Sequence, residues 1–200
     1  MGESEFDVIV VGCGIAGLSA AVTAEQHGAR VAVLERAPME ERGGNTRYTE
    51  SFWRMKSADA VSDDFEERFA ANAGGWPDPG IVKDAVLERE NQPRVLRSLG
   101  MVDPNLVAAL AEEAPKALQW LQSFGVTFDF LPTYFLSQST TRMGPVGGGL
   151  ALIEALGGYA DARPGAIRFF YETSARSLIV DDAGSVAGIR AMRPDNAPLD

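Results

Sequence analysis

Cysteine and histidine are almost missing from this chain, which has one of each, Cys13 and His27, among 200 residues. A single cysteine cannot form an internal disulfide, and this fits a reducing compartment. A zinc site made only of Cys and His side chains cannot be assembled from one of each. A Ser-His-Asp or Cys-His group would have to use His27, whose place before Gly28 suits the end of a helix instead. We therefore expect no metal site, and the catalytic residues stay unknown.

Positive charge and long apolar runs are also scarce. The chain has 18 Lys and Arg against 28 Asp and Glu, a formal net charge of −10. Such a chain is repelled by nucleic acids and anionic membranes. No apolar run reaches the roughly 18 residues of a membrane span, and no signal-peptide pattern precedes the first apolar segment. We expect a soluble cytoplasmic protein with no nucleic-acid partner and no membrane insertion.

Glycine, in contrast, is abundant and ordered near the start of the chain. Residues 6–11 form a nearly continuous apolar run, typical of a strand buried on both faces of a parallel sheet. Residues 15–27 follow with helical spacing, and residues 29–36 read as a second buried strand. Between them, Gly12 permits a tight turn, Gly14 a close approach to a pyrophosphate, and Gly17 close packing of helix and strand. This βαβ unit predicts a dinucleotide site at the helix N-terminus, with the backbone N–H groups of Ile15 and Ala16 free for phosphate.

Glu35 ends the second predicted strand, where an acid can accept hydrogen bonds from a ribose hydroxyl. Its carboxylate disfavours NADP, whose 2′-phosphate it would repel, and the neighbouring Arg36 softens this only slightly. The fingerprint does not separate FAD from NAD. Beyond it lie two glycines and two short polar residues, which indicate either a surface turn or a loop that follows the cofactor: Gly43, Gly44, Asn45 and Thr46.

A set of motifs resembles one known family. "VIVVGCGIAGLSAA", "VLERAP", "RGGNTRYT", "GGGLALIEAL" and "ETSARSLIVDDAGSVAGI" occur in the order found in the FAD-binding subunits of fumarate reductases and succinate dehydrogenases. "LERAP…RGGNTRYT" looks closest to the tricarballylate dehydrogenase-like branch. The resemblance covers essentially the whole chain, but only the first half of the family's pattern.

The resemblance implies a role for individual residues. The pyrophosphate of FAD would lie at Gly12, Gly14 and Gly17, and the adenosine ribose at Glu35. The residues 43–46 would line the route toward the isoalloxazine ring, and the backbone near Ala175 would touch adenine. Asn45 stands where succinate dehydrogenases carry a flavin-linking histidine, so we expect FAD to be bound non-covalently. A further departure from the family, the bulky residues 50–53, leaves the substrate side open.

The resemblance also implies an architecture and an activity. We expect an α/β fold: a Rossmann-like FAD-binding domain with a parallel sheet, flanking helices and a C-terminal β-meander. Residues 1–200 would be a single FAD-binding domain, the N-terminal portion of an enzyme whose capping domain and C-terminal FAD-binding segment follow. The implied reaction is hydride transfer on a di- or tricarboxylate, with an electron-transfer partner protein. This portion is expected to be inactive alone and to leave apolar surface open. Another flavoprotein, such as a hydroxylase, or a non-catalytic flavin-binding module remain alternatives.

The rest of the chain is less informative. Helices are predicted from Asp63, over residues 81–92, from Asp103 with a break at Pro115, and over residues 149–156. Asp182, Ala183 and Gly184 indicate a hairpin. Two cationic features are interpreted either as binding features or as ordinary solvated surface. One is a loop that could face a substrate carboxylate, and the other is a basic patch that could attract a polyanion. The loop contains Ser139, Thr140, Thr141 and Arg142, and the patch comprises Arg42, Arg47, Arg54 and Lys56.

Overall fold

The computed structural model describes residues 6–61, 84, 87–88, 90–93, 104–130 and 142–194. The chain divides into two compact units, which are taken separately below. The first unit comprises residues 1–51 and 147–200, and the second unit comprises residues 52–146. The single FAD-binding domain expected over residues 1–200 stays a prediction.

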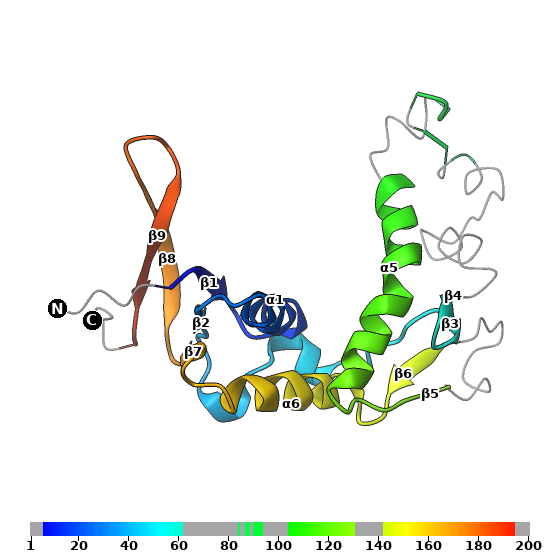
Figure 1. Ribbon diagram of the computed structural model, residues 1–200, viewed down its shortest axis with the longest axis horizontal. Helices are drawn as coiled ribbons and strands as arrows, with labels where there is room; N and C mark the ends of the chain where they lie inside the picture. The colour runs from blue at the N-terminus through cyan, green and yellow to red at the C-terminus, as the bar shows by residue number, and fades with distance from the viewer. Residues whose placement is uncertain are drawn as a thin grey trace. The chain divides into compact units, whose positions relative to one another are not determined.

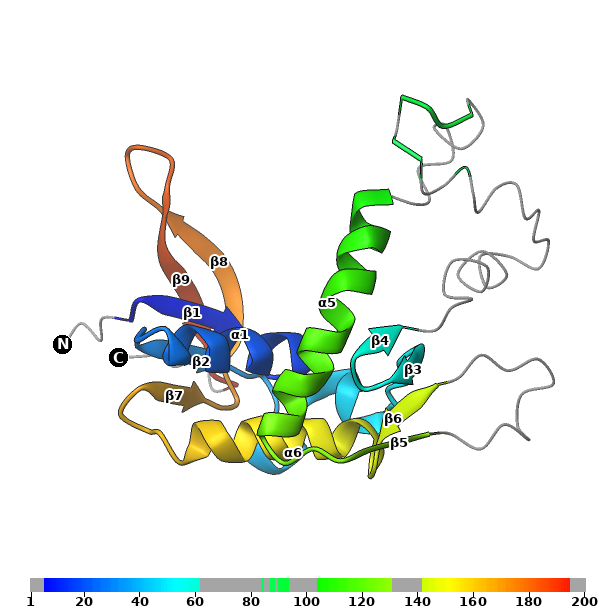
Figure 2. The same cartoon turned by 45° about the vertical axis from the view of Figure 1, so that its right-hand side comes forward.

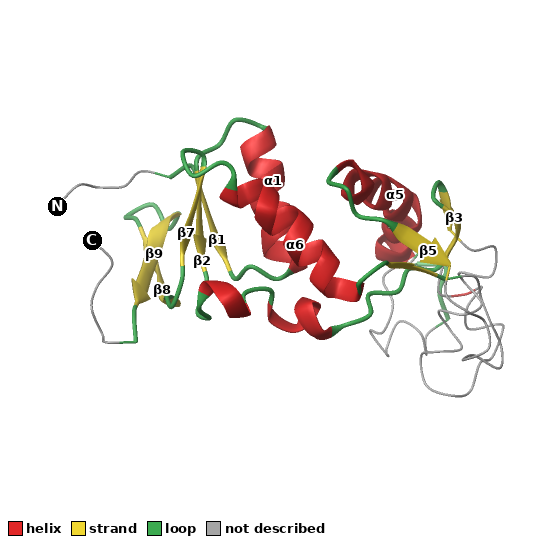
Figure 3. Ribbon diagram, turned by 90° about the horizontal axis from the view of Figure 1, so that it is seen from below, coloured by secondary structure: helices red, strands yellow, loops and turns green. Residues whose placement is uncertain are grey.

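A parallel sheet with helices packed beside it forms the first unit (Figure 1). Helix α1 (Ile15–Gln26) contacts all three strands of the sheet, and helix α6 (Gly148–Asp161) packs against α1 (Figure 3). This arrangement confirms the expected α/β class. The strands are β1 (Val8–Val11), β2 (Val31–Leu34) and β7 (Ile167–Phe170), in the spatial order β1-β2-β7.

The third strand of this sheet, β7, belongs to the C-terminal part of the chain, for which the family resemblance implied a β-meander and not a strand of the parallel sheet. Val31 of β2 pairs with Val8 of β1 on one side and with Ile167 of β7 on the other, both in parallel. Parallel neighbours need long crossover connections, so local alternation cannot reveal which sheet a strand joins. The pairing brings the segment after β7 next to the end of β2.

Burial in the sheet differs between its strands. All four residues of β2 are buried, as expected for a central parallel strand. The expectation that β1 is buried on both faces is wrong: Val10 is buried, but Ile9 and Val11 are 38% and 57% exposed. The physical reason is that β1 is an edge strand, with one face left uncovered by the described part of the chain.

Short elements complete the first unit. Two 3-10 helices, η1 (Met39–Glu41) and η2 (Gly44–Tyr48), follow β2. After β7, strands β8 (Ser174–Val180) and β9 (Val186–Met192) pair as an antiparallel hairpin, which is the extent of the β-meander within the described residues. The side chain of Asp181 accepts the N–H groups of Ala183 and Ser185 at 2.9 and 2.8 Å, and so stabilises the predicted turn.

The second unit contains one described helix, α5 (Pro104–Ser123), and four short strands (Figure 2). The strands pair as two antiparallel ribbons, β3 (Met55–Ser57) with β4 (Ala60–Val61) and β5 (Phe128–Phe130) with β6 (Met143–Pro145). No helix within the described ranges is both long and apolar enough to cross a bilayer.

Two expectations about helices in the second unit can be compared with the structure. The break predicted at Pro115 is wrong, because α5 runs through it without interruption. Proline removes one N–H donor, and here the burial of Leu118 and Leu121 supports the helix beyond it. The helix from Asp63 and most of the helix over residues 81–92 lie outside the described residues.

Candidate dinucleotide site

The glycine turn between β1 and α1 has the geometry that its sequence predicts. Gly12 has a φ of +87°, which side chains rarely tolerate, and its N–H donates to the Leu34 carbonyl at 2.7 Å. A Cβ at Gly17 would overlap the carbonyl oxygen of Gly12 and lie 2.9 Å from its carbonyl carbon. Helix and turn can therefore meet only because residue 17 has no side chain.

The N-terminus of α1 is open to an anion. Its N-cap residue, Gly14, makes no side-chain capping bond, and the first turn carries no acidic side chain. The helix dipole and the amide groups there favour negative charge. One amide already has a partner, because Ile15 N–H donates to Thr46 Oγ1 at 3.2 Å. This bond joins the glycine turn to the second glycine loop, a link that the sequence did not predict.

Glu35 reaches back from the end of β2 to the glycine turn. Its Oε2 accepts the N–H of Cys13 at 2.9 Å, and its Oε1 accepts the N–H of Ala37 at 2.8 Å. The residue is only 6% exposed, and this burial alone would raise the pKa of the carboxyl group. The hydrogen bonds from Ala37 and Cys13 outweigh it, and together they hold the pKa of Glu35 below its ordinary value. The carboxylate is thus kept charged beside the turn.

Cys13 has a role that the sequence did not reveal. Its thiol donates to Glu35 Oε2 at 3.0 Å and is fully buried. Burial, followed by the hydrogen bond to Glu35 and its negative charge, raises the pKa of the Cys13 thiol from 9.0 to about 12. The one feature of the sequence that could have indicated this role is the position of a polar residue, Cys13, between Gly12 and Gly14.

The raised thiol pKa makes the folded state sensitive to alkaline pH. Below pH 9 the thiol is neutral in both the folded and the unfolded chain, so its contribution to the free energy of unfolding is fully present. Between pH 9 and about 12 only the unfolded chain releases the proton, and stability falls by up to about 1.4 kcal/mol per pH unit. We expect Cys13→Ser, which does not titrate there, to lose less stability between pH 8 and 10.5 in urea unfolding. Equal losses in the two proteins would contradict the raised pKa.

The second glycine loop packs against both the turn and α6. A Cβ at Gly14 would lie 3.4 Å from the Gly43 carbonyl oxygen, so the two loops are adjacent. Gly43 itself has a φ of +118° and is buried against Ile153 of α6. Gly44 and Asn45 are exposed, and Thr46 is half-buried. The structure therefore brings this loop to the N-terminus of α1.

Arg42 anchors the loop instead of forming a basic patch. Its guanidinium makes a two-bond ion pair with Asp161 of α6, at 2.8 and 2.7 Å, and donates to the Tyr171 hydroxyl at 2.7 Å. The hydrogen bonds to Asp161, the largest influence, raise the pKa of Arg42 above its ordinary value. Arg47 donates to the Arg42 carbonyl. The predicted polyanion patch is thus wrong for Arg42, and Arg54 and Lys56 belong to the second unit.

The remaining predicted contacts lie around the end of β2. Thr173 N–H donates to the Glu35 carbonyl at 2.8 Å, which fixes the start of β8 beside that residue. Ala175, two residues on, is half-buried and pairs with Ala191. The side chain of Arg36 is exposed. The predicted cofactor residues thus lie in one region of the first unit, where the side chains of Arg36 and Asn45 are exposed.

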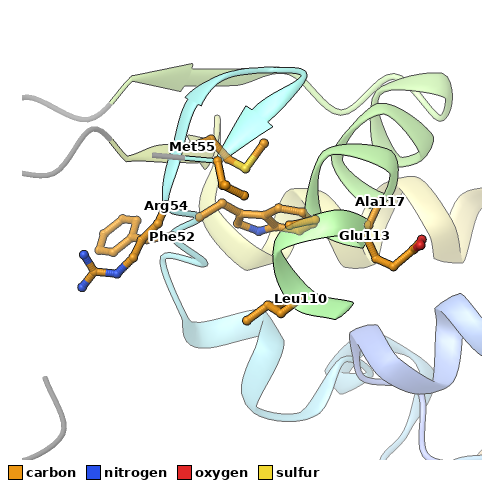
Figure 4. Close-up of a pocket in the computed structure, with 9 residues that line it drawn as sticks. Phe52, Arg54, Met55, Leu110, Glu113 and Ala117 are labelled. Atoms are coloured by element: carbon orange, nitrogen blue, oxygen red, sulfur yellow. The ribbon is translucent and has the colours of Figure 1, made fainter. Parts of the chain in front are cut away.

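The second unit contains a separate, largely apolar pocket of about 440 Å³. Figure 4 shows the Glu113 side chain on α5 at one side and Arg54 on the other, pointing away from α5. Among the described residues, the buried Nε of Arg142 has no hydrogen-bond partner. Its predicted companions, residues 139–141, lie outside the described residues. The pocket is lined by Phe52, Trp53, Arg54, Met55, Val61, Leu110, Glu113, Ala114 and Ala117.

Comparison with known proteins gives one family and several relatives. The family described as FAD binding domain matches residues 7–198. An L-aspartate oxidase from Vibrio cholerae is 31% identical over 127 residues, which are 64% of this chain and 19% of the oxidase. An NADH:fumarate oxidoreductase from Klebsiella pneumoniae is 30% identical, over 64% of this chain and 12% of its own length. A vinyl phenol reductase from Lactiplantibacillus plantarum is 25% identical, over 94% of this chain and 34% of its own length.

Solved structures share the fold. A 3-ketosteroid-Δ4-(5α)-dehydrogenase from Rhodococcus jostii aligns with a TM-score of 0.66 at 23% identity, over all of this chain and 44% of its own. The open form of a flavocytochrome c3 fumarate reductase also gives 0.66, at 24% identity, over 99% of this chain and 32% of its own. The chain thus spans between about an eighth and a third of the length of the curated relatives named above.

Proposed function

The chain belongs to the FAD binding domain family, and on that premise we propose that its first unit holds FAD non-covalently at the N-terminus of α1. The observation that carries the proposal is the hydrogen bond from Cys13 N–H to Glu35 Oε2, at 2.9 Å. It joins a charged carboxylate to the turn that would take the diphosphate. The amide groups of the turn can thus bind the diphosphate, while the neighbouring carboxylate binds the adenosine ribose.

Each predicted residue has a proposed role in this site. The diphosphate lies against the backbone of the glycine turn and the first turn of α1, namely Gly12, Gly14, Ile15, Ala16 and Gly17. Glu35 accepts a hydroxyl of the adenosine ribose, while Arg36 lies exposed beside it. The backbone at Ala175 meets the adenine. Toward the flavin ring the chain offers the second glycine loop, Gly43, Gly44, Asn45 and Thr46.

The proposed chemistry is that of a flavin-dependent oxidoreductase. When bound, FAD supplies a two-electron acceptor and donor for hydride transfer. The chain's own contribution is to bind and orient that group and to keep water from the carboxylate of Glu35. Non-covalent binding is supported by the exposed Asn45, whose amide is not a nucleophile.

Two substrate classes have support. A di- or tricarboxylate is favoured by the relative named as a fumarate oxidoreductase and by Arg142, whose buried Nε lacks a partner in the described part of the chain. A specific observation favours the second class: the pocket beside α5 is mostly apolar and contains Phe52 and Trp53. An apolar or aromatic substrate fits that lining better than a tricarboxylate. Titration of the chain with fumarate and with 4-vinylphenol, followed by tryptophan fluorescence, would separate the two classes by which ligand binds.

Glu35→Gln tests the cofactor site. The change removes the charge that accepts a ribose hydroxyl, and we expect FAD affinity to fall about 10- to 100-fold, the equivalent of one hydrogen bond to a charged group. The measurement is a titration of FAD followed by quenching of flavin fluorescence, with circular dichroism to verify folding. Glu154→Gln is the matched control, because this residue is exposed on α6 and should leave affinity unchanged. Equal affinities of a folded Glu35→Gln protein and the parent would falsify the proposed role.

A further inference from the structure

The carboxylate of Glu35 has little hydrogen-bonding capacity left on the oxygen that faces the glycine turn. A carboxylate offers about four acceptor positions, two on each oxygen. Oε2 already accepts both the N–H and the thiol of Cys13, at 2.9 and 3.0 Å. Oε1 accepts Ala37 N–H, and the N–H of Arg36 also lowers the pKa of this group by hydrogen bonding. A ribose hydroxyl can therefore bind Oε2 only if one of these donors withdraws.

The donors differ in their ability to withdraw. The N–H of Cys13 is fixed by the backbone of the turn, whereas the S–H bond can rotate about the Cβ–Sγ bond. A thiol is also a weak donor, and a hydroxyl makes a shorter and stronger hydrogen bond to a carboxylate. The sulfur itself can stay in place, because it is fully buried, and the backbone N–H of Gly43 in the second glycine loop lowers the pKa of this thiol.

We infer that the Cys13 thiol is a placeholder for the adenosine-ribose hydroxyl, donating to Glu35 in the free chain and giving up that position when FAD binds. The inference rests on the proposed function. It assigns Cys13 as a positioning residue that acts through Glu35. The hydrogen bond from the thiol stabilises the free chain. Glu35 is only 6% exposed there, and a buried acceptor position without a donor would lower the free energy of unfolding. The thiol satisfies that acceptor with the donor that the ligand displaces most easily.

The inference predicts opposite effects from two small substitutions. Cys13→Ala removes a hydrogen bond that exists only in the free chain, so the free chain loses stability and FAD binds about threefold to tenfold more tightly. Cys13→Ser provides a stronger donor that competes with the ribose hydroxyl, so the free chain gains stability and FAD binds more weakly by a similar factor. A purely structural role would instead make both substitutions weaken FAD binding.

The experiment measures thermal unfolding without ligand and FAD affinity for the parent chain, Cys13→Ser and Cys13→Ala. A second titration uses an FAD analogue that lacks the adenosine-ribose 2′-hydroxyl. The expected order of FAD affinity is Ala, Cys, Ser from tightest to weakest, the reverse of the order of stability, and the differences should shrink with the analogue. Weaker FAD binding by Cys13→Ala, or the same order with the analogue, overturns the inference alone. A parent chain that binds no FAD overturns both the inference and the proposed function.

Discussion

Gly17→Ala is expected to lower the stability of the chain by about 3 kcal/mol and to abolish FAD binding at micromolar ligand. The added Cβ would overlap the Gly12 carbonyl oxygen and lie 3.3 Å from Val10 Cγ1. Backbone atoms of a tight turn cannot move aside as a flexible side chain can, so α1 must shift away from β1. The N-terminus of α1 would then no longer face the turn. In thermal unfolding the loss corresponds to roughly 6–12 °C for a chain of this size.

A control separates this effect from the general consequences of adding a methyl group to a helix. An exposed glycine inside a helix usually gains about 1 kcal/mol when it becomes alanine. Gly158 lies in α6, where an added Cβ meets no atom of the described residues within 4 Å. Gly158→Ala should therefore be neutral or stabilising and should bind FAD like the parent. If Gly17→Ala behaves in the same way, the close approach of helix and turn is not needed.

Gly149→Ala is expected to be the second most damaging change, with a loss of about 2–3 kcal/mol. Its Cβ would overlap the carbonyl oxygen of Thr46, and the N–H of Gly149 donates to the Thr49 carbonyl at 2.7 Å. The 3-10 helix η2 would have to move off α6. Thr46 would move with it and lose its hydrogen bond with the N–H of Ile15.

The effect on the cofactor site distinguishes Gly149→Ala from a simple loss of stability. We expect the folded fraction of this variant to bind FAD at least tenfold more weakly, because the second glycine loop no longer lies on the first turn of α1. Urea unfolding and an FAD titration on the same protein give the two quantities. Gly158→Ala serves again as the control, since both glycines lie in α6. Undiminished affinity in a destabilised Gly149→Ala protein would mean that η2 does not shape the site.

The sequence predicted the parts of this molecule whose structure depends on neighbours along the chain. Gly12, Gly17 and Gly28 lie where a turn, a close contact and a helix end require them, because each requirement is local. The resemblance to the family is likewise confirmed, since it depends on the order of motifs. The turn at residues 182–184 follows from its residues alone.

What the sequence did not predict depends on contacts between distant segments. The thiol of Cys13 and the carboxylate of Glu35 are 22 positions apart, and Arg42 and Asp161 are 119 positions apart. No local sequence pattern shows whether a basic residue forms an ion pair within the protein or stays available to bind a ligand. The exposed face of β1 was missed for a related reason. An apolar run predicts a strand that can be buried on both faces. Whether the strand is buried depends on which other segments cover it.

The central claim is that the amide groups at the start of α1 hold the diphosphate of FAD. Its most direct test is a titration of ¹⁵N-labelled chain with FAD, followed by the chemical shifts of the backbone amides. We predict that the largest changes fall on Gly14, Ile15, Ala16 and Gly17, with smaller changes at Gly43 and Gly44. Changes confined to residues 52–146, or no change at α1 when FAD is bound, would contradict the claim.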